Sequence, residues 1–160
     1  MIENRAKQLG VEIPKPPEPQ ASYVPTKRVG DLVYTSGMGA IRGGERQYCG
    51  RVGEDVSVEG AYQSARYATL NCLAALREAI GSLDTVAGIM KVTGYVRSAP
   101  GFCEQHKVLN GASDLLVELF EERGRHTRSA IGVSELPFGI SVEVEMIASV
   151  VPDEEKGEGG

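Results

Sequence analysis

The sequence predicts an α+β domain in which two helices cover one face of a single mixed β-sheet. Apolar residues recur at spacings of three and four in two long segments, and β-rich runs precede, separate and follow those segments. We expect strands joined through helices to place both helices on the same face, with right-handed crossovers where strands are parallel. The length of 160 residues suits one domain with a real core.

Both ends of the chain differ in composition from its middle. Residues 1–21 are expected to form an N-terminal arm, in which residues 1–9 make a short polar helix that ends at Gly10. The PKPPEP segment that follows cannot continue a helix and runs extended over the surface. Residues 22–151 form the single domain. Residues 152–160 are charged and glycine-rich, which predicts a disordered tail.

The domain is expected to open with strands and turns. The chain becomes strand-like after Tyr23, and residues 31–36 are a β-rich run bounded by Gly30 and Gly37. Four glycines between residues 42 and 53 indicate a hairpin or a loop with short strands. These patterns place a β-hairpin before the first long helix.

The first long helix is expected to follow Asp55 or Ser57, either of which can act as its N-cap, and to end at Gly81. Its apolar stripe is rich in small residues: Val58, Ala61, Ala65, Ala68, Cys72, Leu76 and Ala79. Small side chains allow the helix to lie close to a sheet. Because Cys72 belongs to this stripe, we interpret it as a core thiol and not a reactive one.

The second helix is expected over residues 101–122, with Ser98 as its cap and Pro100 in its first turn. Its apolar positions are Phe102, Leu109, Ala112, Leu116, Leu119 and Phe120. Strands are expected before and after this helix, at residues 89–96, 129–133 and 140–150.

The last strand separates apolar from polar side chains by strict alternation. One face carries Val142, Val144, Met146, Ala148 and Val150, and the other carries Ser141, Glu143, Glu145 and Ile147. The apolar face suits the helices. The other face is polar without being fully charged, which predicts an oligomer whose sheets pack around a semi-polar interior.

Charge and composition argue against several classes of function. The net charge is −5, the pI is about 5.1, and the basic residues are scattered, which disfavours nucleic acid as the main partner. Three cysteines without C-x-x-C spacing and two histidines fit neither a disulfide framework nor a zinc site. The sequence contains no phosphate-binding motif, so a nucleotide cofactor is not expected. With no apolar leader or membrane span in the sequence, a reducing cytoplasm is expected.

The strongest candidate site residues lie in the C-terminal third. Arg128 opens a strand of small residues, and its planar guanidinium suits the carboxylate of a keto or imino acid. Glu143 and Glu145 share one strand face, where a carboxylate can position or deprotonate water. Taken alone, each also fits an ordinary surface ion pair.

Other candidates lie near strand ends and on the second helix. Ser36 and Gly37 end a strand, where a hydroxyl and free N–H groups can bind an anion. Tyr23 can cover a pocket, His106 can face a cleft, and His126 can orient the loop before Arg128. For each of these, a packing or capping role is the structural alternative.

Together these segments resemble the RidA (YjgF/YER-type) family over residues 22–150. The matching landmarks occur in the family's order: GDLVYTSG at 30–37, the helix through Asn71 and Leu76, Val92 to Val96 leading to Phe102, RS at 128–129, LP at 136–137 and VEVE at 142–145. The resemblance implies the chorismate-mutase-like fold, a homotrimer with a central barrel, and clefts between subunits. It implies hydrolysis of reactive 2-imino and enamine acids to 2-keto acids and ammonia, with neither metal nor organic cofactor.

The resemblance also assigns roles to residues. Arg128 is the substrate-carboxylate arginine, and Glu143 is the glutamate that handles water. Tyr23, Ser36 and Gly37 match the family's tyrosine, strand-end serine and glycine, and backbone groups around Ala130 complete the pocket.

Some positions depart from the family pattern. His106 replaces the family's helix asparagine when the helix is aligned from Phe102, and Ala130 stands where a cysteine is common. The segment between Phe102 and Arg128 is several residues longer than in deaminase-type members, and the arm is longer too. The chain therefore resembles a less characterised branch.

Two alternatives to an imine deaminase stay open at this level. The same clefts can sense a carboxylate metabolite without turnover, which predicts Arg128-dependent binding alone. The family also carries a description as a ribonuclease or translation inhibitor, against which the acidic charge weighs.

Overall fold

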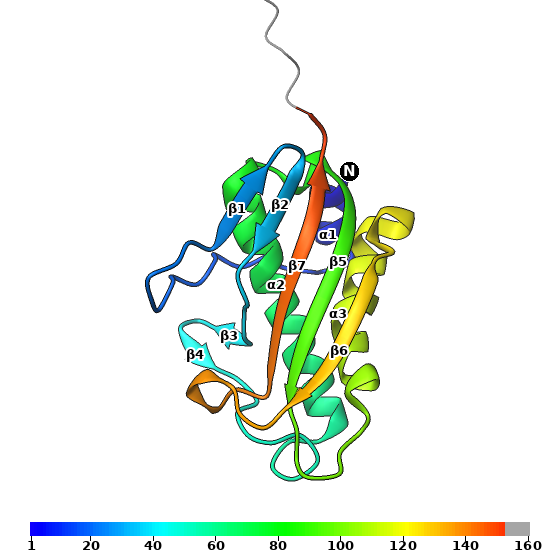
Figure 1. Cartoon of the computed structure of the whole chain (residues 1–160). Helices are drawn as coiled ribbons and strands as arrows, with labels where there is room; N and C mark the ends of the chain where they lie inside the picture. The colour runs from blue at the N-terminus through cyan, green and yellow to red at the C-terminus, as the bar shows by residue number, and fades with distance from the viewer. Residues whose placement is uncertain (153–160) are drawn as a thin grey trace, which may run out of the picture.

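The computed structural model describes residues 1–152 as one sheet with helices packed on one side (Figure 1). In chain order the helices and strands are α1 (Ile2–Gln8), β1 (Thr26–Val29), β2 (Leu32–Thr35), β3 (Ile41–Arg42), β4 (Glu45–Arg46), α2 (Val58–Ile80), β5 (Val86–Arg97), α3 (Gln105–Phe120), β6 (Thr127–Val133) and β7 (Val142–Val150). Three short 3₁₀ helices lie at Leu83–Thr85, Glu121–Gly124 and Pro137–Gly139. The expected tail lies outside the described residues, except for Pro152.

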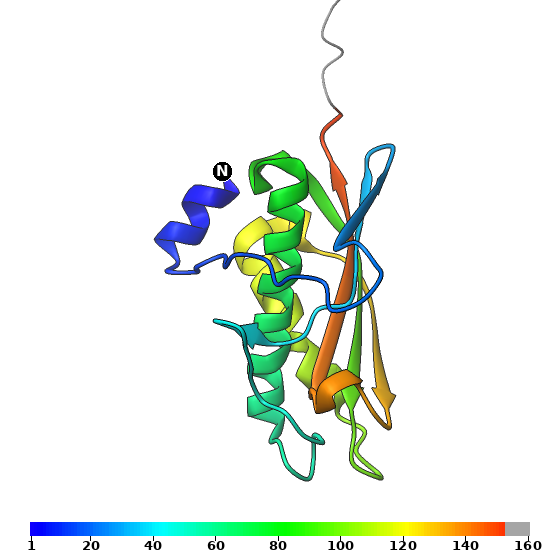
Figure 2. The same ribbon diagram turned by 90° about the vertical axis from the view of Figure 1, so that its left-hand side faces the viewer.

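Five strands form one mixed sheet in the order β1-β2-β7-β5-β6. β5 and β6 are parallel and joined through α3, and the other neighbouring pairs are antiparallel. β3 and β4 form a separate small hairpin. Helices α2 and α3 make one layer and the sheet makes the other (Figure 2). The predicted α+β class, mixed sheet and single helical face are confirmed.

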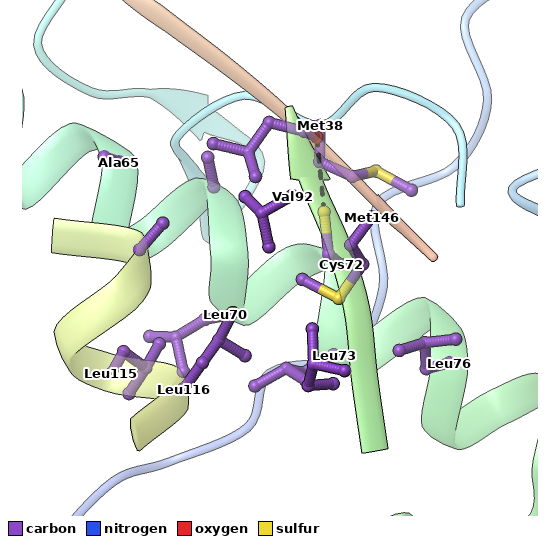
Figure 3. Close-up of a cluster of buried hydrophobic side chains, with 14 of the residues drawn as sticks. Met38, Ala65, Leu70, Cys72, Leu73, Leu76, Val92, Leu115, Leu116 and Met146 are labelled. Carbon is purple, nitrogen blue, oxygen red and sulfur yellow. Dashed lines mark hydrogen bonds between the residues drawn. The ribbon is translucent and has the colours of Figure 1, made fainter. Parts of the chain in front are cut away.

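The alternation predicted for β7 places its apolar residues in the core. Val142, Val144, Met146, Ala148 and Val150 are all buried against the helical layer. From α2, the residues from Ala61 to Leu76 of the expected stripe are buried, while Ala79 in its last turn is exposed. Cys72 lies in this core beside Val92 and Met146 (Figure 3). Its Sγ donates to the Val144 carbonyl at 3.3 Å, and burial raises its pKa, which confirms a core thiol.

Local signals located both ends of α2 correctly and misplaced the start of α3. Ser57 Oγ accepts from the Gly60 N–H at 3.0 Å, and Gly81 ends the helix with a positive φ of 87°. The second helix starts at Gln105, and not at residue 101. Gly101 adopts a φ of 80°, which no helix accommodates, and Ser98 Oγ donates to the Val96 carbonyl.

The N-terminal arm is anchored to the domain. The predicted helix forms as α1, but it is not wholly polar, because Ile2 and Ala6 are buried in the core. Arg77 of α2 then donates to the carbonyls of Ile13 and Pro14 at 3.1 and 3.2 Å. From there the arm crosses the helical layer toward the sheet (Figure 2).

The opposite face of the sheet carries half-buried polar and apolar side chains. On β7 these are Glu143, Glu145 and Ile147, as the alternation predicted. Ser141 differs from the prediction, because it precedes the strand and its hydroxyl donates to Ser64 Oγ in the interior at 2.9 Å. Among residues 1–152, no helix covers this face (Figure 2).

Replacing Gly111 with alanine tests the close approach of α2 and α3. A Cβ at Gly111 would lie 2.0 Å from the Tyr62 carbonyl oxygen, so the helices must separate. We expect a loss of about 1–3 kcal/mol in the free energy of unfolding, as for overpacked cores. Urea denaturation measures it. A gain of about 1 kcal/mol, the usual result for glycine to alanine inside a helix, would contradict this packing.

Candidate functional site

A cavity of about 700 Å³ opens on the uncovered face of the sheet, between the N-terminal arm, the β3–β4 hairpin and the Pro137–Gly139 turn. Four residues that the sequence predicted for the site line it: Tyr23, Ser36, Gly37 and Glu143. They come from segments far apart in the chain, which meet because β2 and β7 are neighbours in the sheet.

Gly37 leaves room for the carboxyl group of Glu143. Met38 and Val144 exchange two backbone hydrogen bonds, of 2.8 and 2.9 Å, which hold the segment after β2 against β7. A Cβ at Gly37 would lie 2.8 Å from Glu143 Cδ, closer than real Cβ atoms approach. The glycine is therefore required by the nearby carboxyl group.

The two glutamates of β7 differ in their surroundings. Tyr95 donates its hydroxyl to Glu145 Oε1 at 2.8 Å, and this bond raises the pKa of Tyr95. No group among the described residues donates a hydrogen bond to the carboxyl group of Glu143. Burial raises the pKa of Glu143, and the charge of Glu145 raises it further. Glu143 is therefore a carboxylate of increased basicity that faces the cavity.

The arm closes one side of the cavity. Ser36 Oγ donates to the Val24 carbonyl at 2.6 Å, and Ser36 N–H donates to the Pro25 carbonyl. The serine hydroxyl therefore fixes the arm at the edge of the cavity. Just after the arm, Tyr23 is 47% exposed and lines the cavity, and its hydroxyl accepts from the backbone N–H of Gln20 at 3.5 Å.

Arg128 belongs to a second cluster, between the edge strand β6 and α3. Its guanidinium donates to Asn110 Oδ1 at 3.0 Å, Ser113 Oγ at 3.1 Å and the His106 carbonyl at 3.2 Å. His106 thus contacts Arg128 through its backbone, while its imidazole is exposed. Ala130, two residues further along β6, packs against the core.

Sequence reasoning missed the side chains that hold Arg128. Asn110 and Ser113 contact the guanidinium directly, and His126 Nε2 lies 2.9 Å from Ser113 Oγ. His126 Nδ1 lies 2.6 Å from the Gly124 carbonyl, so it is the protonated nitrogen, and burial lowers the pKa of this histidine. Residues 106, 110 and 113 follow helical spacing, a signal that was present in the sequence.

Arg128 and Glu143 lie on opposite faces of the sheet. Arg128 pairs with Val92, which is fully buried beneath the helices. Glu143 pairs with Tyr95, which lines the open cavity. One chain therefore brings Tyr23, Ser36, Gly37 and Glu143 together and leaves Arg128, His106 and Ala130 apart from them.

A protein-family model described as "YjgF/chorismate_mutase-like, putative endoribonuclease" matches residues 3–149. The chain belongs to the YjgF/chorismate-mutase-like family. The expected RidA resemblance is thereby confirmed, and the match includes most of the N-terminal arm. Protein TCP17 of Trypanosoma cruzi is 35% identical over 145 residues, which cover 90% of this chain and 91% of that protein.

Solved structures of YjgF-type proteins share the fold. Atu1372 from Agrobacterium tumefaciens, of unknown function, is 40% identical with a TM-score of 0.87, covering 94% of this chain and 92% of the other. A "putative endoribonuclease" from Shewanella oneidensis MR-1 is 33% identical with a TM-score of 0.91, covering 94% and 99%. TdcF from E. coli, solved with bound serine, is 23% identical with a TM-score of 0.59, covering 86% and 94%, and shares the fold.

The described residues hold neither a cluster of metal ligands nor a helix able to span a membrane. Residues 1–152 contain no group of three or more His, Cys, Asp or Glu side chains placed to hold a metal ion. In the same residues, no helix has both the length and the apolar character of a membrane span.

Replacing Glu145 with glutamine tests the coupling between the two carboxyl groups. The change removes a negative charge that raises the pKa of Glu143, so we expect that pKa to fall. Glutamine can still accept the Tyr95 hydrogen bond. Titration of the labelled glutamate carboxyl carbons by NMR measures the shift. Glu45→Gln on the exposed β4 is the control, and an unchanged Glu143 pKa in Glu145→Gln would refute the coupling.

Proposed function

We propose that this chain hydrolyses 2-imino acids, and their enamine tautomers, to 2-keto acids and ammonia. One observation carries the proposal: the Glu143 carboxyl group faces a cavity, with Gly37 against it and its pKa raised by burial. A carboxylate of raised pKa is well suited to accept a proton from water near neutral pH. Membership of the YjgF family supports the assignment.

We further propose that the complete site forms between subunits of a homotrimer whose open sheet faces surround a central barrel. Arg128 and Glu143 cannot meet within one chain, because they lie on opposite faces of the sheet. Arg128 belongs to an edge strand, where a neighbouring subunit can reach it. The half-buried face with Tyr95 and Ile147 supplies the surface that such an assembly would cover.

The proposed reaction adds water across the C=N bond. Arg128 binds the substrate carboxylate through its N–H groups, and Glu143 takes a proton from water as the water oxygen attacks the imine carbon. Glu143 then passes that proton to the nitrogen of the carbinolamine. As the C–N bond breaks, Glu143 transfers the hydroxyl proton to the departing nitrogen, so ammonia leaves and the carbonyl of the 2-keto acid forms.

Three findings favour a small carboxylate substrate over RNA. The net charge is −5, and both Glu143 and Glu145 line the cavity, which opposes a polyanion. TdcF, which shares the fold, holds serine, a small molecule with an α-carboxylate. The endoribonuclease in the family description is therefore the less suitable function for this site.

Mixing two inactive variants tests the shared site. Arg128→Ala removes the carboxylate-binding group and Glu143→Gln removes the base, so each alone should lose activity on 2-iminopropanoate, about 10²–10⁴-fold for the base. After unfolding and refolding an equal mixture, we expect roughly a quarter of wild-type activity, because random assortment in a head-to-tail ring rebuilds that share of sites. Ammonia and keto-acid release measures it.

Mixing shows whether two chains share the site, and a binding measurement on the wild type separates an enzyme from a sensor. Variants refolded separately are the control. No recovery in the mixture, with trimers present, would place the whole site within one chain. Wild-type protein that binds pyruvate without accelerating hydrolysis would indicate a carboxylate sensor in place of an enzyme.

The pH dependence of kcat/KM should show an acid limb set by Glu143. The reaction requires the ionised form of Glu143, and burial raises the pKa of this carboxyl group. As the pH is lowered, activity should therefore begin to fall at a higher pH than an ordinary glutamate would give. A rate profile for the wild type over this range checks it. The acid limb should be absent from the residual activity of Glu143→Gln, and its persistence there would assign the base to another group.

A further inference from the structure

We propose that Arg46 forms a second anion-binding position in the Glu143 cavity, which selects 2-imino acids whose side chain ends in a carboxylate. This inference rests on the proposed function, since it names the substrate class of the same site. It assigns Arg46 to the far carboxylate of the substrate and leaves the α-carboxylate to Arg128.

Arg46 is a cation in the cavity wall without an acidic partner. It lies on β4, lines the same cavity as Glu143, and forms no ion pair or side-chain hydrogen bond within residues 1–152. Arg42, the other arginine of the β3–β4 hairpin, differs because it donates to the Tyr67 hydroxyl at 2.9 Å. In a chain of net charge −5, an unpaired guanidinium in a cavity is a position for an anion.

Stacking on Phe138 orients this guanidinium while leaving its donors available. Arg46 Cζ lies 3.8 Å from the centre of the Phe138 ring. A guanidinium stacked through its flat face keeps its N–H groups around the edge, where they can grip a carboxylate with two hydrogen bonds. Phe138 lines the cavity as well, so the stacked pair belongs to its wall.

The turn that carries Phe138 is held in a strained conformation. Phe138 adopts a φ of 60° although the residue is 63% exposed, so core packing does not explain the strain. Arg97 braces the turn by donating to Glu135 at 2.9 Å and to the Gly139 carbonyl at 3.4 Å. Arg51 also pairs with Glu135. Arginine side chains therefore contact the chain on both sides of Phe138.

The size and lining of the cavity fit a longer acid. In the single chain its volume is about 700 Å³, within the roughly 300–1,000 Å³ of sites for drug-sized ligands. Apolar groups from Ile41, Pro137 and Ile140 lie along its wall, with the carboxylates and Arg46 as its charged groups. A short methylene chain that ends in a carboxylate matches this arrangement.

Binding of stable keto acids tests the inference without requiring turnover. We measure the Kd of 2-oxoglutarate and of pyruvate for the full chain by calorimetry. We expect the wild type to prefer 2-oxoglutarate and Arg46→Gln to weaken it about 10–100-fold, the value of a charge-assisted hydrogen bond. Pyruvate binding should stay unchanged. Arg42→Gln is the matched control, because Arg42 lies on the same hairpin outside this cavity.

Kinetic measurements extend the same comparison to imines. The imines of alanine and of glutamate are generated in situ, and kcat/KM is measured for the wild type and Arg46→Gln. We expect a selective loss for the five-carbon diacid. Phe138→Leu, which removes the ring and keeps an apolar side chain, should give a smaller loss of the same selectivity.

The outcomes distinguish this inference from the proposed function. Absence of a wild-type preference for 2-oxoglutarate, or equal effects of Arg46→Gln on both ligands, overturns the role of Arg46. In that case Arg128-dependent hydrolysis of 2-iminopropanoate still supports the deaminase. Conversely, Arg46-dependent binding of 2-oxoglutarate without hydrolysis of any imine upholds the anion position and refutes the enzyme.

Discussion

The hydrogen-bond register of β7 is the constraint on which the rest of the structure depends. β7 pairs with β2 on one side and β5 on the other, and its side chains alternate between two environments. Val142, Val144 and Met146 must enter the core, so Glu143 and Glu145 must face the cavity. A slip of one residue would bury both carboxylates and expose the core, which makes the register costly to change. Fold and site are thus fixed by the same ladder.

The same strand places two neighbouring glutamates, Glu143 and Glu145, in different surroundings. Tyr95 lies on β5 in register with Glu143, yet its hydroxyl reaches Glu145. That bond holds the Glu145 carboxyl group in place, and the charge of Glu145 raises the pKa of Glu143. Of two glutamates separated by a single valine, one accepts a hydrogen bond from Tyr95 and the other faces the cavity with a raised pKa.

Short-range sequence patterns predicted much of the fold. The alternation of β7, the small-residue stripe of α2 and the Ser57 cap are local or periodic, and each was found as expected. The start of α3 was missed because the positive φ of Gly101 reflects a turn whose geometry composition alone does not encode. Tyr23, Ser36, Gly37 and Glu143, which were all proposed as site residues, line one cavity.

The parts that were missed depend on contacts between distant segments. The stacking of Arg46 on Phe138 joins positions 92 residues apart by number, with no periodicity to mark them. The separation of Arg128 from Glu143 follows from strand register, since Val92 and Tyr95 are three positions apart and so face opposite sides of β5. Candidate residues can be named from a sequence, but the face each one occupies requires the pairing of strands.

The part of the cavity wall that contains Tyr23 is not built on the sheet, unlike the part that β7 contributes. It belongs to a segment outside the five-stranded ladder, anchored at one end by Arg77 on α2 and at the other by Ser36. Substitutions between these two anchors alter the cavity without disturbing strand pairing or core packing. The shape of this cavity can therefore be changed through the crossing segment alone, while the five-stranded sheet that forms its floor stays as it is.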